Sequence, residues 1–126
     1  MAYRECDINV ALPYENESFD YVVCLEIIEH VDDPFALSRE CRRELRKNGS
    51  LYISTPNILN MRSRMKFLLD GSFLFFNLPP MEWEERDGRP SVHVHPICYH
   101  ELEYYLFRAG LNVVEAFTNE RSTSWK

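Results

Sequence analysis

Two carboxyl groups and an imidazole follow directly after one apolar stretch of this chain. The stretch covers residues 21–25, and Glu26, Glu29 and His30 come next. Side chains three and four positions apart share one face of a helical turn, so we expect these polar groups to converge. An imidazole is well suited to take a proton from a hydroxyl group, although alignment of the reactants alone is sufficient for some group transfers. The pattern predicts a site here, with Glu29 and His30 as the catalytic candidates.

A divalent metal ion is an alternative use of the same groups. His93 and His95 stand two positions apart on a later segment, and the alternation of a strand would turn both rings to one side. Carboxylate oxygens and imidazole nitrogens together suit Mg, Mn or Zn. We favour the alternative without a metal, in which Glu29 and His30 close a hydrogen-bonded network at the end of a strand.

A strand, a helix and a second strand are predicted around this polar cluster. The near-continuous apolar run over 19–25 is typical of a parallel strand covered on both faces. Helical spacing follows over 34–47, with Asp32 or Asp33 as its cap, and 50–55 forms the next strand. This order predicts a right-handed βαβ unit. The polar cluster would then lie at the carboxyl ends of parallel strands, where open α/β sheets bind their ligands.

The second half of the chain is predicted to hold two more helices and a final strand. Residues 60–69 and 100–109 have helical spacing, and 111–117 has the pattern of a strand. Between the two helices, 72–96 is rich in aromatic residues and proline, which is typical of a lid or cover segment. The cations of the 60–69 helix are interpreted as a solvated face, with recognition of an anionic substrate group as the alternative.

The composition limits the class of protein and its partners. The 126 residues carry a net charge of -6, which argues against nucleic acid as a partner. Because the sequence has neither a membrane-spanning apolar run nor a signal peptide, we expect no membrane partner and a cytoplasmic location. The four cysteines lack short paired spacing, which predicts reduced core thiols rather than a zinc ribbon or a disulfide framework.

Several short motifs in a fixed order resemble those of a known enzyme family. They are Asp7-Ile8-Asn9, Leu12-Pro13-Tyr14, Ser18-Phe19-Asp20, Glu29-His30-Val31, Thr55-Pro56-Asn57 and Ala109-Gly110-Leu111. The pattern is similar to that of class I S-adenosylmethionine-dependent methyltransferases of the type 11/12 group, which includes ubiquinone-biosynthesis O-methyltransferases. The resemblance extends over residues 7–117 and implies an α/β, Rossmann-like fold.

The resemblance also implies a cofactor, S-adenosylmethionine, bound across the carboxyl ends of the early strands. By matching position, Asp7 and Ile8 would contact the adenine ring, and Cys24 and Leu25 would lie beside the methionine part. The catalytic candidates would face the methyl acceptor, which the resemblance implies is a small molecule methylated on oxygen or nitrogen.

The glycine-rich turn that admits the cofactor in this family is missing from the sequence. Its four glycines are scattered rather than clustered. We therefore expect a single partial methyltransferase domain over 1–126, with about three parallel strands, the first strands missing, and 72–96 as its lid. Such a fragment is predicted to be inactive alone and to form a homo-oligomer through its exposed sheet edge. The alternatives are a non-catalytic oligomerising or interaction module, and a metal-dependent enzyme similar to RNA 3′-terminal 2′-O-methyltransferases.

Overall fold

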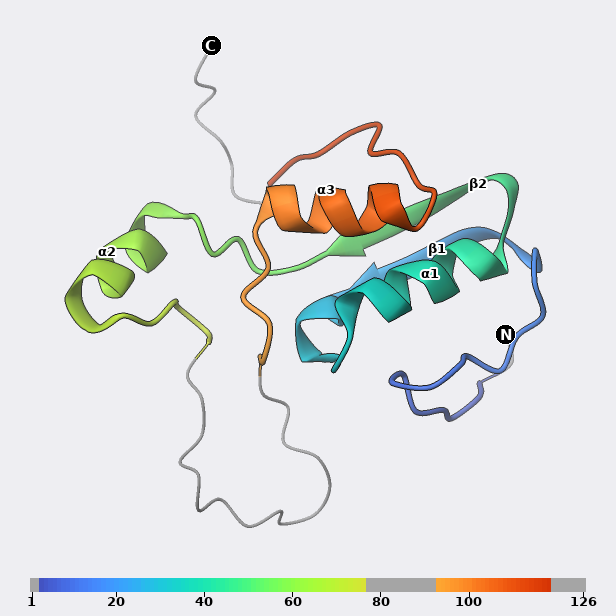
Figure 1. The fold of residues 1–126 in the computed structure, drawn as a ribbon, viewed down its shortest axis with the longest axis horizontal. Helices are drawn as coiled ribbons and strands as arrows, with labels where there is room; N and C mark the ends of the chain where they lie inside the picture. Colours follow the sequence, from blue (N-terminus) through green and yellow to red (C-terminus); the bar gives the residue numbers. More distant parts are fainter. Residues whose placement is uncertain (1–2, 77–92, 119–126) are drawn as a thin grey trace.

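The computed structural model describes residues 3–76 and 93–118 and shows an α/β arrangement (Figure 1). The elements in chain order are strand β1 (Phe19–Leu25), a short 3₁₀ helix η1 (Ile28–His30), helix α1 (Pro34–Glu44), strand β2 (Leu45–Ser54), helix α2 (Met61–Asp70) and helix α3 (Tyr99–Arg108). In the described part of the chain, β1 and β2 pair in parallel in one sheet, joined through α1. The predicted βαβ unit and the partial Rossmann-like α/β class are therefore confirmed.

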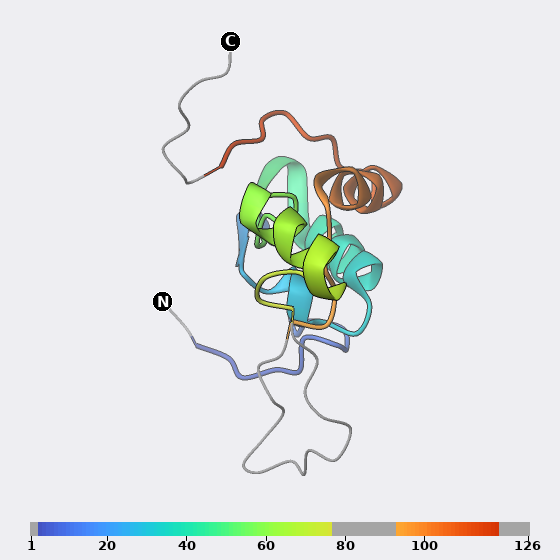
Figure 2. The same ribbon diagram turned by 90° about the vertical axis from the view of Figure 1, so that its left-hand side faces the viewer.

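The helices cover one face of this sheet. Figure 2 shows α1 and α3 on the same side of the two strands, with α2 in front of the strands' carboxyl ends. The buried core between sheet and helices consists of Cys24, Ile28, Val31, Leu37, Cys41 and Ile97. It therefore joins β1, η1 and α1 to the segment that enters α3.

The opposite face of the sheet is open within the described residues. Tyr21, Val23 and Leu25 alternate along β1, and each is more than half exposed. Tyr52 on β2 lies beside them, with its ring centroid 6.4 Å from that of Tyr21. The apolar run predicts a strand covered on both faces, whereas the described residues cover only one.

Helix α1 begins as the sequence predicts but ends earlier. The backbone N–H of Ala36 donates to Oδ1 of Asp33 at 2.9 Å, so Asp33 is the cap. The helix ends at Glu44 rather than at residue 47. Leu45 turns into an extended conformation and is almost fully buried. Burial of this side chain at the start of β2 outweighs the helical preference of the basic residues that follow it.

An irregularity near the start of β2 explains why this strand begins at Leu45 rather than at the predicted residue 50. Phe19 pairs with Leu45, but Tyr21 already pairs with Ser50, so β2 has more residues than β1 over this stretch. Asn48 has a φ of 64°, in the left-handed region that asparagine tolerates. Asn48 and Gly49, a pair that is typical of the end of a helix, therefore lie in a bulge inside the strand.

The later helices agree with the sequence, but the predicted last strand is not found. Asn60 caps α2, accepting from the N–H of Ser63 at 3.0 Å, and Gly71 ends it with a φ of 76°. Residues 111–117 run without strand pairing to any described residue, and Val114 is 97% exposed. The sheet thus has two strands in the described part of the chain rather than about three. Of the predicted 72–96 lid, residues 77–92 lie outside the described residues.

A helix can span a bilayer only if it is long and apolar enough. None of the helices in the ranges 3–76 and 93–118 is long and apolar enough to cross a bilayer.

Candidate functional site

The single turn η1 holds the two predicted catalytic residues just beyond β1. The N–H of His30 donates to the carbonyl of Ile27 at 2.9 Å and closes the turn. Ile28 is fully buried and anchors the turn to the core. Glu29 is also fully buried, whereas His30 is partly exposed, and Oε1 of Glu29 lies 3.9 Å from Nε2 of His30. The structure therefore brings the predicted pair together.

The segment before α3 adds a second imidazole to this pair. The N–H groups of residues 94 and 95 both donate to the carbonyl of Glu29, at 2.9 and 3.1 Å. This anchoring places the ring of His93 edge-on to that of His30, with centroids 4.5 Å apart. Phe76 packs against His93 at 5.1 Å. Ligand atoms of Glu29, His30 and His93 all lie within 4.8 Å of one another, which makes this trio a candidate metal-binding cluster.

Two side chains of this cluster, those of Glu29 and His93, carry buried polar atoms that are unpaired. Within the described residues, neither carboxyl oxygen of Glu29 has a hydrogen-bond partner, and neither has the buried Nδ1 of His93. Buried polar side chains normally have partners, because an unpaired one costs about 1–3 kcal/mol. The arrangement offers one oxygen ligand and two imidazoles, a donor set suited to Zn or Mn. It equally allows Glu29 to orient His30 for proton transfer.

Glu26 is held away from the cluster, although spacing predicts that it converges there. Its N–H donates to the carbonyl of Ser54 at 3.2 Å, and its Oε1 accepts from the Ser54 hydroxyl at 2.6 Å. The backbone of Glu26 has a φ of 52°, a left-handed conformation that residues other than glycine adopt only at a cost in free energy. Glu26 therefore joins the ends of β1 and β2 instead of facing His30.

Cys24 and Leu25, two of the predicted cofactor residues, point to opposite faces of the sheet. The Sγ of Cys24 lies in the core, 3.6 Å from the Sγ of Cys41, while Leu25 is exposed on the open face. The contact with Cys41 holds the pKa of the Cys24 thiol below its usual value, and the same contact together with burial raises the pKa of Cys41. A cofactor at the strand end would thus meet the backbone of Cys24, not its side chain.

Asp7 and Ile8, the other two predicted cofactor residues, lie in a turn that is tied to the segment just after η1. Oδ1 of Asp7 accepts from the N–H of Asn9 at 3.0 Å, and Oδ1 of Asn9 accepts from the N–H of Asp32 at 2.8 Å. Ile8 packs against the core. The turn is therefore fixed next to the exit of η1.

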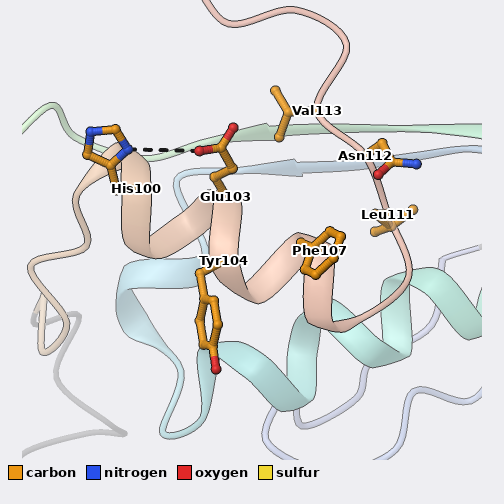
Figure 3. A pocket seen from close by; sticks show the side chains of 7 residues that line it. All are labelled: His100, Glu103, Tyr104, Phe107, Leu111, Asn112 and Val113. Carbon is orange, nitrogen blue, oxygen red and sulfur yellow. Dashed lines mark ion pairs between the residues drawn. The ribbon is translucent and has the colours of Figure 1, made fainter.

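A separate cleft of about 400 Å³ lies between α3 and the segment that follows it (Figure 3). Its lining is His100, Glu103, Tyr104, Phe107, Leu111, Asn112 and Val113. Nδ1 of His100 faces Oε2 of Glu103 at 3.8 Å. None of the predicted site residues lines this cleft, so it is distinct from the cluster around Glu29.

The sequence of this chain is similar to those of known methyltransferases. Residues 1–53, which include β1, α1 and nearly all of β2, match the family model of a methyltransferase domain. The chain is 29% identical over 135 aligned residues to a ubiquinone biosynthesis O-methyltransferase from Coxiella burnetii, an alignment that covers 94% of this chain and 57% of the relative. A protein of the same name from Xanthomonas oryzae is 42% identical over 55 residues, covering 44% of this chain and 23% of the relative.

By these matches the chain is similar to methyltransferases, in line with the βαβ unit and with the resemblance of its motifs to the class I S-adenosylmethionine-dependent family. Within that class, the curated relatives named above are of the ubiquinone-biosynthesis type, as the sequence motifs predict. The chain spans little more than half the length of the Coxiella relative.

Proposed function

We propose that this chain forms the acceptor-side part of an S-adenosylmethionine-dependent methyltransferase that acts on an oxygen or nitrogen of a small molecule. The observation that carries the proposal is the meeting of Glu29 and His30 just beyond β1, inside the segment that matches a methyltransferase domain. In this proposal His30 takes the proton of the acceptor group, and the buried Glu29 orients the imidazole.

S-adenosylmethionine supplies the activated methyl group, and the residues present fit only part of that cofactor. The turn of Asp7 and Ile8 and the exposed end of β1 at Leu25 offer one polar and one apolar contact surface. The glycine-rich turn that the family uses has no counterpart among the four scattered glycines. We therefore propose that this chain alone binds the cofactor weakly and is inactive until a glycine-rich half is supplied.

Complementation tests this function directly. The chain is titrated calorimetrically with S-adenosylmethionine, alone and after mixing with a polypeptide that carries the glycine-rich half of the Coxiella relative. We expect no micromolar binding by the chain alone, and binding with methyl transfer to small-molecule test acceptors that carry hydroxyl or amino groups in the mixture. His30→Ala should abolish transfer and retain binding, whereas His100→Ala, a histidine change outside the cluster, should leave both intact. Full activity of His30→Ala would contradict the assigned role.

A metal-dependent version of the reaction is a second candidate, favoured by the close approach of Glu29, His30 and His93 and by the unpaired atoms of Glu29 and His93. In this version the three side chains hold a divalent ion that orients the acceptor oxygen, as in the metal-dependent 2′-O-methyltransferases that the motif resembles. Calorimetric titration with Mn²⁺ and Zn²⁺ is the test. Glu29→Gln should weaken metal binding at least tenfold. Glu26→Gln should not, because Glu26 is bonded to Ser54 and lies outside the trio.

A non-catalytic interaction module remains as the alternative from a different class of function. The open face of Tyr21, Val23 and Leu25 supports it, and so does the edge of β1 that pairs with no described strand, because unpaired edges template pairing with another chain. Homo-oligomerisation through this edge is part of the proposal, and analytical ultracentrifugation measures it. A dimer that Val23→Lys dissociates would support the edge as the interface. A cytoplasmic location is also proposed, supported by the four free cysteines.

A further inference from the structure

Two cysteine thiols meet in the buried core between β1 and α1. Cys24 lies near the end of β1 and Cys41 lies in the second half of α1, 17 positions later in the chain. Both are free cysteines, and their Sγ atoms are 3.6 Å apart. A strand and a helix hold the two side chains inside one packed core cluster, so this contact is a fixed feature of the fold.

The distance between the two sulfur atoms is suited to disulfide formation. An S–S bond is about 2.05 Å long, so the sulfurs have to approach each other by about 1.5 Å. Rotation about χ1 of either cysteine moves its sulfur by a distance of this order and leaves the backbone of β1 and α1 in place. A bond between Cys24 and Cys41 therefore needs only a local movement of the core.

The two thiols differ in reactivity. Cys24 is 6% exposed, whereas Cys41 is 1% exposed. The hydrogen bond from Cys41 lowers the pKa of Cys24 against the opposing effects of burial and of the Glu44 carboxyl group, and the same contact raises the pKa of Cys41. Because the thiolate is the form that attacks an oxidant, Cys24 is the attacking thiol and Cys41 is the partner that resolves the product.

We propose that Cys24 and Cys41 are a redox-active pair that hydrogen peroxide converts reversibly into a disulfide. The Cys24 thiolate attacks one peroxide oxygen, the O–O bond breaks, and Cys24 becomes a sulfenic acid while hydroxide leaves and takes up the proton that Cys24 released. The Cys41 thiol then attacks the Cys24 sulfur, the S–S bond forms, and the sulfenic oxygen leaves as water. Two thiols and one peroxide thus give one disulfide and two waters, and a dithiol reductant reverses the change.

The disulfide encloses the turn that carries the predicted catalytic residues. Residues 25–40 lie between the two cysteines, and they include η1 with Glu29 and His30. A covalent link between β1 and α1 removes conformations in which these elements separate, so it opposes local opening of η1. Oxidation therefore acts on the candidate site through the fold, and it does not depend on which reaction the site performs.

A redox titration of the folded and the unfolded chain tests the proposal. The full chain carries Cys6→Ser and Cys98→Ser, so that only the core pair remains. It is equilibrated with reduced and oxidised glutathione in buffer and in concentrated urea, and the disulfide is identified by a loss of about 2 Da. We expect an equilibrium constant for the bond at least tenfold larger in the folded chain, a potential lower by about 30 mV. An equal or smaller constant in the folded chain would overturn the proposal, because the native geometry would then not favour the bond.

Peroxide treatment of matched variants tests the order of attack. Trypsin cleaves after Arg39, so Cys24 and Cys41 fall on separate peptides, and mass spectrometry should find these linked until dithiothreitol is added. In the same background, Cys41→Ser should leave Cys24 to gain oxygen without a link, whereas Cys24→Ser should leave Cys41 unmodified. Oxidation of Cys41 in the Cys24→Ser chain, or a Cys24 that gains oxygen instead of forming the link while Cys41 is present, would contradict the assigned roles.

Hydrogen exchange measures the effect on the candidate site. The amide of His30 donates to the carbonyl of Ile27 and closes η1, so its exchange reports the opening of this turn. We expect this amide to exchange at least tenfold more slowly in the oxidised chain than in the reduced chain. An unchanged rate would overturn the inferred action of the disulfide on η1.

Discussion

Replacing Glu29 with methionine separates the contribution of this residue to function from its contribution to the fold. The side chain is fully buried, and within the described residues neither carboxyl oxygen has a hydrogen-bond partner. The 3.9 Å separation from Nε2 of His30 exceeds hydrogen-bond distance and offsets little of this cost. Methionine keeps the length of the side chain and removes both oxygens, so we expect the free energy of unfolding to rise by about 1–3 kcal/mol.

Urea denaturation followed by far-UV circular dichroism measures this change. With a denaturant slope of about 2 kcal/mol per molar, a gain of about 2 kcal/mol moves the midpoint up by about 1 M. In the complemented enzyme the same variant should lose methyl transfer, because it removes the carboxyl group that lies 3.9 Å from the imidazole of His30 and that the proposed reaction uses to orient it. A more stable but inactive protein is the expected result.

Glu40→Met is the matched control, because it makes the same chemical change at a paired carboxyl group. Arg43 donates to both oxygens of Glu40, at 3.0 and 2.8 Å, and the N–H of Leu12 donates to one of them at 3.0 Å. We expect this variant to lose about 1 kcal/mol, since the pair is partly exposed. If Glu29→Met instead lowers the midpoint as Glu40→Met does, the Glu29 carboxyl supports the fold and the reasoning above is wrong.

Three further predictions concern a helix cap, the acid range of stability and a crowded glycine. Asp33→Ala should lower the free energy of unfolding by about 1 kcal/mol in thermal melts, and Asp32→Ala, which removes no cap, should change it little. The hydrogen bonds from Arg43 hold the pKa of Glu40 below its ordinary 4.5. The stability from this contact is therefore present above that value and lost as the pH falls toward the lower folded pKa, and Glu40→Gln should flatten this loss in urea midpoints measured from about pH 6 to pH 3. Gly49→Ala would place a Cβ 3.0 and 3.1 Å from two backbone oxygens, so its urea midpoint should show a loss of about 1–3 kcal/mol.

Local signals in the sequence predict the elements whose ends depend on local contacts. The predicted cap by Asp33 forms, and the residue types of Asn60 and Gly71 are likewise typical of the cap and the stop that they make at the ends of α2. The apolar run of β1 likewise predicts the strand at its correct position. Each of these features is decided by side chains within a few residues of the backbone that they fix.

Long-range packing decides the boundaries that the sequence pattern misses. The helix stops at Glu44 because burial of Leu45 beside the sheet competes with continued helix, and no local residue type signals this. Residues 111–117 have the alternation of a strand, but a strand also needs a partner, and these residues pair with neither edge of the described two-stranded sheet.

In the candidate site, too, the sequence predicts what local contacts decide and misses what long-range contacts decide. Spacing correctly brings Glu29 and His30 into one turn, because a single turn is a local structure. It wrongly includes Glu26, whose direction is set by Ser54 at the end of the neighbouring strand. His93 joins through backbone contacts of residues 94 and 95 with Glu29, and its only sequence signal is the His-x-His pattern.

Two energetic costs of different kinds occur within four residues of each other, at Glu26 and Glu29. Glu26 has hydrogen-bond partners but a left-handed backbone, whereas Glu29 lies in a regular turn but has two unpaired buried oxygens. A sequence under selection for folding alone could avoid both costs, with glycine at the first position and an apolar residue at the second. Such costs persist where a site needs the strained or unpaired group. Their occurrence together at the carboxyl end of β1 is therefore an independent physical reason, apart from any similarity to known enzymes, to locate the chemistry of this chain there.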